Sequence, residues 1–120
     1  MTVPGGVDVY WLPHCTTCQK AVQHLEAKGV PVRRFRNLKE EPLSVDEVRD
    51  LARKAGGIEK LFSRRAMKYR SMGLNEREGP EDEMVKLMSE EYTFVTRPVI
   101  VRGDRATAGF SAKRVDELVG

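Results

Sequence analysis

The chain has 120 residues, of which 40% are hydrophobic and 32% are charged, and its formal net charge is +3. This length suits one domain with one core, and the mild charge with interspersed acidic and basic residues does not indicate a nucleic-acid-binding surface. No apolar run approaches the roughly 18 residues that cross a bilayer, and residues 1–6 lack the charged and apolar regions of a signal peptide. We therefore expect a cytoplasmic, monomeric protein with no membrane partner and no direct nucleic-acid partner.

The first predicted elements are a strand, a helix and a second strand. Residues 7–12 form an apolar run between glycines and a proline, which indicates a buried strand. A helix is expected over residues 16–28, because apolar side chains recur at helical spacing at Cys18, Ala21, Val22 and Leu25. Residues 30–35 predict a second strand, parallel to the first in a βαβ unit. Three arginines in and beside this strand are expected to protect a sheet edge and serve solubility: Arg33, Arg34 and Arg36.

The middle of the chain, about residues 43–91, carries helical signals. Ser44 and Glu47 have the spacing of a capping box, and the helix that they open should stop at Gly56. Three further helices are expected after it, over residues 58–62, over 66–72 and from Pro80 onwards. These signals predict a helical insertion between the second and third strands.

The last predicted elements are two strands and a helix. Residues 98–102 read as a buried strand, residues 105–109 as its antiparallel partner, and Ser111 as the cap of a final helix. The order β-α-β, helical block, β-β-α predicts an α/β protein with a thioredoxin-like fold and a mixed four-stranded sheet. We expect a single domain over residues 1–120.

The pattern with the most chemical content is Cys15-Thr16-Thr17-Cys18, which holds both cysteines of the sequence. A thiol at a helix N-terminus meets unpaired N–H groups and the positive end of the helix dipole, so its pKa is expected to fall. Cys18 lies on the apolar stripe of the helix, whereas Cys15 precedes the helix and can stay exposed. This asymmetry predicts Cys15 as an attacking thiol and Cys18 as a protected resolving thiol.

Two other interpretations of the cysteine pair are buried structural thiols and half of a zinc site. Zinc needs two more ligands, and the sequence offers only His14 and His24, the latter roughly 240° around the helix from Cys18. No resident metal is therefore predicted, and a reducing compartment favours redox chemistry. His14 is either a solvated loop residue or a cation that lowers the pKa of Cys15.

Four segments in the same order resemble the arsenate reductase (ArsC)/Spx family of the thioredoxin-like superfamily, over about residues 7–119. They are the C-x-x-C-x-K-A motif at residues 15–21, the Pro-Leu-Ser segment at 42–44, Gly57 followed eight positions later by Arg65, and the Arg97-Pro98 strand start with the later Gly109-Phe110. The resemblance implies arsenate reduction with Cys15 as nucleophile and with Arg65 and Arg97 as ligands of the oxyanion. Arg64 competes with Arg65 for that role.

The resemblance has further implications for the site. Guanidinium groups suit the spread charge of arsenate, and Pro98 is expected to follow a cis peptide bond that aims Arg97 at the cysteine loop. No cofactor is expected to stay bound. The reductant implied is an external thiol system, either thioredoxin or glutathione with glutaredoxin.

The chain departs from the glutaredoxin-coupled reductases at three places. Those proteins have serine at the position of Cys18, a histidine at the position of Trp11, and a third arginine where this chain reads Ala108-Gly109-Phe110-Ser111. Two alternative functions therefore stay open. One is an Spx-like redox-sensing transcription regulator that docks on RNA polymerase, with Gly57 at the docking-loop glycine, and the other is a general thiol–disulfide oxidoreductase.

Overall fold

The structure is a computed structural model, and it describes residues 6–63 and 81–119, without the side chains of residues 81–83. The helix predicted over residues 66–72 lies outside the described residues. The chain forms two compact units, which we describe separately: residues 1–41 with 97–120, here called the sheet unit, and Pro42–Thr96, here called the helical unit. None of the described helices is long and apolar enough to span a membrane.

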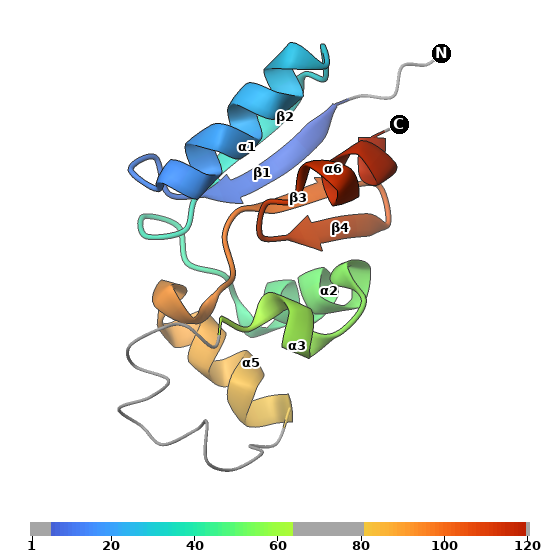
Figure 1. The fold of residues 1–120 in the computed structure, drawn as a ribbon. Coiled ribbons are helices and arrows are strands. Elements are labelled where there is room, and N and C mark those ends of the chain that lie inside the picture. The colour runs from blue at the N-terminus through green and yellow to red at the C-terminus, as the bar shows by residue number, and fades with distance from the viewer. Residues whose placement is uncertain (1–5, 64–80, 120) are drawn as a thin grey trace. The chain divides into compact units, whose positions relative to one another are not determined.

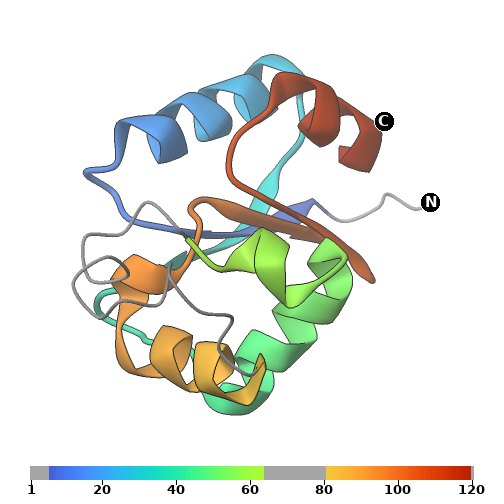
Figure 2. The same cartoon turned by 60° about the horizontal axis from the view of Figure 1, so that its bottom comes forward.

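The sheet unit contains a mixed four-stranded sheet in the order β2-β1-β3-β4. Its strands are β1 (Val7–Trp11), β2 (Val32–Asn37), β3 (Val99–Arg102) and β4 (Arg105–Ala108). β1 pairs in parallel with β2 and antiparallel with β3, and β3 pairs antiparallel with β4. Two helices, α1 (Thr16–Ala27) and α6 (Ala112–Val119), cover one face of this sheet (Figures 1 and 2). The predicted thioredoxin-like α/β fold is thereby confirmed.

β2 begins two residues later than predicted because the preceding residues complete the end of α1. The Val30 N–H donates to the Leu25 carbonyl at 3.0 Å, and Gly29 has a positive φ of 72°. This is the pattern of a glycine-terminated helix, in which backbone beyond the helix satisfies its last carbonyls. Val30 therefore belongs to the helix end and not to the sheet.

The core of the sheet unit lies between the sheet and the two helices. Val7 and Val9 of β1 point to this face because alternate residues of a strand share a face. Apolar side chains of α1 and α6 at helical spacing meet them. The fully buried or nearly buried members of the cluster are Val7, Val9, Ala21, Leu25, Ile100, Val115 and Leu118.

The arginines of β2 divide into two groups. Arg33 and Arg34 are exposed on this edge strand, as predicted. The prediction for Arg36 is wrong, because its side chain is buried. Arg36 is paired in register with Tyr10, its guanidinium lies 5.8 Å from the Tyr10 ring centroid, and its Nε donates to the Glu41 carbonyl at 3.1 Å. Its hydrogen bond to Glu41 holds the loop after β2 in place, so Arg36 does not serve to protect the sheet edge.

The helical unit contains α2 (Val45–Ala55), α3 (Ile58–Leu61), α5 (Glu81–Glu90) and the short 3₁₀ helix η2 (Tyr92–Phe94). The predicted capping box is present at the start of α2, and α2 ends at Gly56 in the left-handed conformation. The unit has its own apolar core, in which the Phe62 and Phe94 rings stack at 5.4 Å. These elements form the predicted insertion between the second and third strands.

Candidate functional site at the start of helix α1

Cys15 is the N-cap residue of α1. Its backbone is extended, with φ −81° and ψ 118°, and its Sγ accepts a hydrogen bond from the Cys18 N–H at 3.4 Å. The Cys15 thiol is partly buried and free. The first turn of α1 contains no acidic residue, so the exposed N–H groups and the positive end of the helix dipole act on this sulfur without a competing carboxylate.

Three hydrogen bonds hold the loop that carries Cys15. The Cys15 N–H donates to the Leu12 carbonyl at 3.0 Å, and the Leu38 N–H joins the end of β2 to the Trp11 carbonyl at 3.0 Å. The Gln19 side-chain amide donates to the Pro13 carbonyl at 2.7 Å. Sequence reasoning missed Gln19, because its partner is a backbone atom that no side-chain pattern reveals.

Cys18 is fully buried on the inner stripe of α1. Burial raises the pKa of the Cys18 thiol to about 12, although the Leu12 backbone opposes this shift. The hydrogen bond with the Cys15 side chain also raises the pKa of Cys18. Cys18 is therefore a neutral thiol that donates toward its neighbour.

The pKa of Cys15 is lowered from its ordinary value. Partial burial acts in the opposite direction, but it is outweighed by hydrogen bonds from the Cys18 side chain and backbone, by the positive charge of Arg97 and by the Thr17 backbone. Each of these groups stabilises the thiolate more than the thiol. The two cysteines, three positions apart, thus have pKa values displaced in opposite directions.

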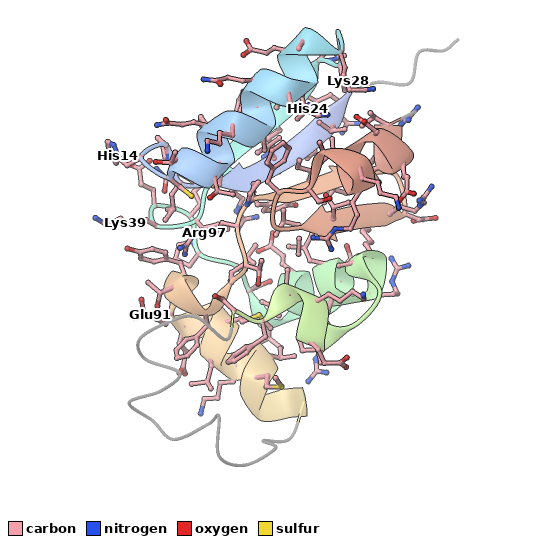
Figure 3. The ribbon with its side chains drawn as sticks, viewed as in Figure 1. His14, His24, Lys28, Lys39, Glu91 and Arg97 are labelled. Atoms are coloured by element: carbon pink, nitrogen blue, oxygen red, sulfur yellow. The ribbon has the colours of Figure 1, made fainter. Side chains whose placement is uncertain are left out.

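Arg97 stands two residues before the start of β3, and the Arg97–Pro98 peptide bond is cis, as predicted. In Figure 3, Arg97 lies near the start of α1, and its positive charge lowers the pKa values of both Cys15 and Cys18. The Pro98 carbonyl accepts the Gly109 N–H at 2.9 Å, which joins this segment to the end of β4. The structure therefore brings three of the predicted site residues together: Cys15, Cys18 and Arg97.

The two histidines lie apart from this cluster. His14 is exposed on the loop before α1, and it is not among the groups that lower the pKa of Cys15 (Figure 3). His24 pairs with Asp116 of α6 at 2.8 Å, and the same carboxylate accepts Lys28 at 3.2 Å. Within residues 6–63 and 81–119, no three His, Cys, Asp or Glu side chains are grouped to hold a metal. Arg65 and its rival Arg64 lie outside the described residues.

The sheet topology and the C-x-x-C pair at the start of α1 define a protein of the thioredoxin-like class with a redox-type cysteine site. The profile of the ArsC family matches residues 10–118. Because this match spans most of the sequence, the chain belongs to the ArsC family.

Individual relatives carry different names. The chain is 33% identical over 115 residues to protein YusI of Bacillus subtilis (strain 168), across 93% of this chain and 97% of YusI. It is 29% identical over 110 residues to the global transcriptional regulator Spx of the same strain, across 91% of this chain and 83% of Spx. Among solved structures, an arsenate reductase from Vibrio cholerae matches with a TM-score of 0.86 and 21% identity, across 97% of this chain and 99% of that chain. This last similarity shows a shared fold.

Proposed function

We propose that this protein is a thiol-dependent oxidoreductase that reduces arsenate to arsenite. The observation that carries the proposal is the placement of Cys15 at the N-cap of α1, where its Sγ accepts the N–H of the buried Cys18 at 3.4 Å. The opposite displacement of the two thiol pKa values agrees with this geometry. The lowered pKa favours ionisation of the partly exposed Cys15, and the thiolate form of a cysteine is the nucleophile, whereas the buried Cys18 stays a protonated thiol. Membership of the ArsC family supports the choice of arsenate as the substrate.

The proposed reaction begins with attack of the Cys15 thiolate on arsenic. A sulfur–arsenic bond forms, and one arsenic-bound oxygen leaves as water after protonation. Arg97 neutralises charge on the remaining oxygens, and Arg65 is the second proposed ligand. Arsenic is not yet reduced in this step, and the two cysteines supply both electrons in the next one, so the proposed reaction uses no bound cofactor.

The second step is attack by Cys18 on the Cys15 sulfur. Cys18 loses its proton to solvent or to an arsenic-bound oxygen, a Cys15–Cys18 disulfide forms, and the sulfur–arsenic electron pair stays with arsenic. Arsenic leaves as arsenite, reduced by two electrons, while the two cysteines are oxidised by two electrons. A thioredoxin, or glutathione with glutaredoxin, would then reduce the disulfide.

The test is arsenate-dependent NADPH oxidation by the purified protein, coupled in parallel to thioredoxin with thioredoxin reductase and to glutathione with glutaredoxin. Turnover in one arm would support arsenate reduction and identify the donor. Cys18→Ser should block a thioredoxin-only route and spare a glutathione-dependent route. Turnover of a disulfide substrate without arsenate would instead favour a general thiol–disulfide oxidoreductase, and inactivity in every arm would contradict the enzymatic proposal.

A redox-sensing transcription regulator is the second candidate function, favoured by a cavity in the helical unit. The cavity has a volume of about 220 Å³ and is lined by two arginines and by small or apolar residues: Arg49, Ala52, Arg53, Gly57, Ile58 and Val85. A cavity lined by both basic and apolar residues suits a protein partner, although Arg53 also pairs with Asp50 at 2.8 Å. The similarity to the regulator Spx supports the same interpretation.

The regulator is tested by binding to purified RNA polymerase, with the protein in its reduced and in its Cys15–Cys18 disulfide form. Oxidation-dependent binding that is lost in Arg49→Glu, and retained in the control Arg105→Glu on β4, would favour this function. Equal absence of binding in both redox forms would contradict it.

A further inference from the structure

An aromatic side chain stands exposed on strand β2. Phe35 is 44% exposed, and among the described residues only Val45 of α2 is a comparably exposed large hydrophobic side chain. The Phe35 ring lies against the ring of Trp11 on β1, with centroids 4.7 Å apart and planes inclined by 37°. The two rings form an apolar patch at the side of the sheet.

This apolar patch lies beside the arginines of the sheet edge formed by β2. β2 is the terminal strand of the sheet, and in the described part of the chain it pairs only with β1. Arg33 is 62% exposed, with its Nε 3.5 Å from Asp8 Oδ1. Arg34 is exposed as well and has no acidic partner among the described residues. Both arginines come directly before Phe35 in the sequence.

Protection of the edge accounts for the arginines but not for the phenylalanine. Charged side chains and a bulge discourage unwanted strand pairing, and β2 has both, with a register shift opposite Val7 and Asp8. An exposed aromatic ring on the same strand works against that protection. A surface that combines an apolar patch with the charge of Arg34, which has no acidic partner among the described residues, is suited to a partner that supplies acidic and apolar side chains.

We infer that the β2 edge is a docking surface for an extended acidic segment of a partner protein. The segment lies along β2, places an apolar side chain on Phe35 and brings a carboxylate to Arg34, whereas Arg33 already faces Asp8. Alternate side chains of an added strand face opposite sides, which allows both kinds of contact. A second copy of this chain is disfavoured as occupant, because it would bring two edges with the same exposed arginines into one interface.

The proposed surface is connected to the cysteine loop through the backbone. Trp11 is the last residue of β1, its carbonyl accepts the Leu38 N–H from the end of β2, and the adjacent Leu12 carbonyl accepts the Cys15 N–H. A segment docked on Phe35 would therefore lie beside the strand ends that carry the cysteine loop. The inference does not depend on the reaction that Cys15 performs.

Trp11 provides a direct probe, because it is the single tryptophan of the sequence. The experiment titrates the full chain with a short synthetic peptide that alternates glutamate with valine and leucine and contains no aromatic residue. The expected result is a saturable change in Trp11 emission that weakens as salt is added. The control peptide, with lysine in place of glutamate, should give no saturable change.

Two variants test the assignment of the surface. Phe35→Ser and Arg34→Glu should each weaken peptide binding by roughly tenfold or more, measured by calorimetry because Phe35→Ser also changes the surroundings of Trp11. Val45→Ser is the matched control, since it removes the other exposed hydrophobic side chain without touching β2. Circular dichroism and thermal unfolding would verify that each variant is folded.

Three outcomes would overturn the inference. The first is equal binding of the glutamate and lysine peptides or no binding of either. The second is unchanged affinity in both Phe35→Ser and Arg34→Glu. The third is concentration-dependent self-association of the natural chain that Phe35→Ser abolishes, which would identify a second copy as the occupant.

Discussion

The starts of helices α1 and α2 show two different uses of the same structural feature. At α2, Ser44 Oγ accepts the Glu47 N–H at 3.1 Å, and Glu47 Oε1 accepts the Ser44 N–H at 3.0 Å. The first turn of α2 also contains Asp46. At α1, the cap is the sulfur of Cys15, which accepts the Cys18 N–H at 3.4 Å, and no acidic residue is present in the first turn.

The difference separates a helix start built for stability from one that favours a thiolate. Two reciprocal hydrogen bonds and two carboxylates satisfy the donors and the dipole of α2. At α1 the same donors and dipole act on a sulfur that bears negative charge when it ionises, and Arg97 adds a full positive charge. When it is ionised, Cys15 supplies the negative charge that Asp46 and Glu47 supply at the start of α2.

The largest expected effect is the loss of turnover in Cys15→Ser. This substitution replaces the reactive N-cap residue of α1 with serine, a residue that is preferred at helix N-caps. If the proposed reaction is correct, turnover with arsenate should fall by on the order of 10³-fold or more, because the nucleophile is lost. The free energy of unfolding should stay equal or rise by up to about 1 kcal/mol, because serine is a favoured N-cap residue. Coupled NADPH oxidation and denaturant unfolding measure the two effects. Turnover within tenfold of the natural chain would remove Cys15 as the nucleophile.

Arg97→Gln tests the charge that distinguishes the two helix starts. The positive charge of Arg97 lowers the pKa of Cys15, so its removal should raise that pKa and move the pH midpoint of Cys15 alkylation upward. Alkylation at neutral pH should slow as the thiolate fraction falls. The measurement is the rate of reaction with iodoacetamide as a function of pH in a Cys18→Ser background, with Arg105→Gln, at an exposed position of β4, as the control. An unchanged midpoint in Arg97→Gln would contradict the role of this charge.

Ser44→Ala tests the structural side of the comparison. The substitution removes the side-chain acceptor of the capping box and should lower the free energy of unfolding by about 1 kcal/mol. The alkylation rate of Cys15 should not change, since Ser44 takes no part in the interactions of that thiol. Denaturant unfolding gives the first quantity and alkylation kinetics the second. Full stability in Ser44→Ala would show that the cap of α2 contributes nothing.

Thr17→Asp has the smallest expected effect on stability and is the sharpest test of the comparison. It places a carboxylate at the position in α1 that Asp46 occupies in α2. The helix should gain about 0.3–1 kcal/mol from the dipole interaction, while the new negative charge should raise the pKa of Cys15 and slow its alkylation at neutral pH.

Thr17→Asn is the matched neutral control for this variant. It should leave the pH midpoint of alkylation close to that of the natural chain. If Thr17→Asp and Thr17→Asn shifted the midpoint equally, the effect would come from the lost hydroxyl and not from charge. The proposed distinction between the two helix starts would then fail.

Local patterns predicted most of the fold because each depends on neighbours in the sequence. The capping box at Ser44, the helical spacing of Ala21 and Leu25, and the alternation of Val7 and Val9 were sufficient to predict helices, strands and buried faces. Arg36 shows the limit of this reasoning. Its burial depends on Tyr10, which the parallel register places beside it, and no local signal reports that pairing.

The sequence by itself determined the fold class, the position of Cys15 before a helix and the burial of Cys18 on the apolar stripe of that helix. These features follow from residue spacing, which sets periodicity and helix ends. Only the tertiary structure decided which distant groups act on the thiol. It brings the charge of Arg97 to Cys15 across 82 positions of the sequence (97 minus 15), and it leaves the adjacent His14 in solvent. Coulombic interactions depend on distance in space and on solvation, neither of which is a property of sequence separation.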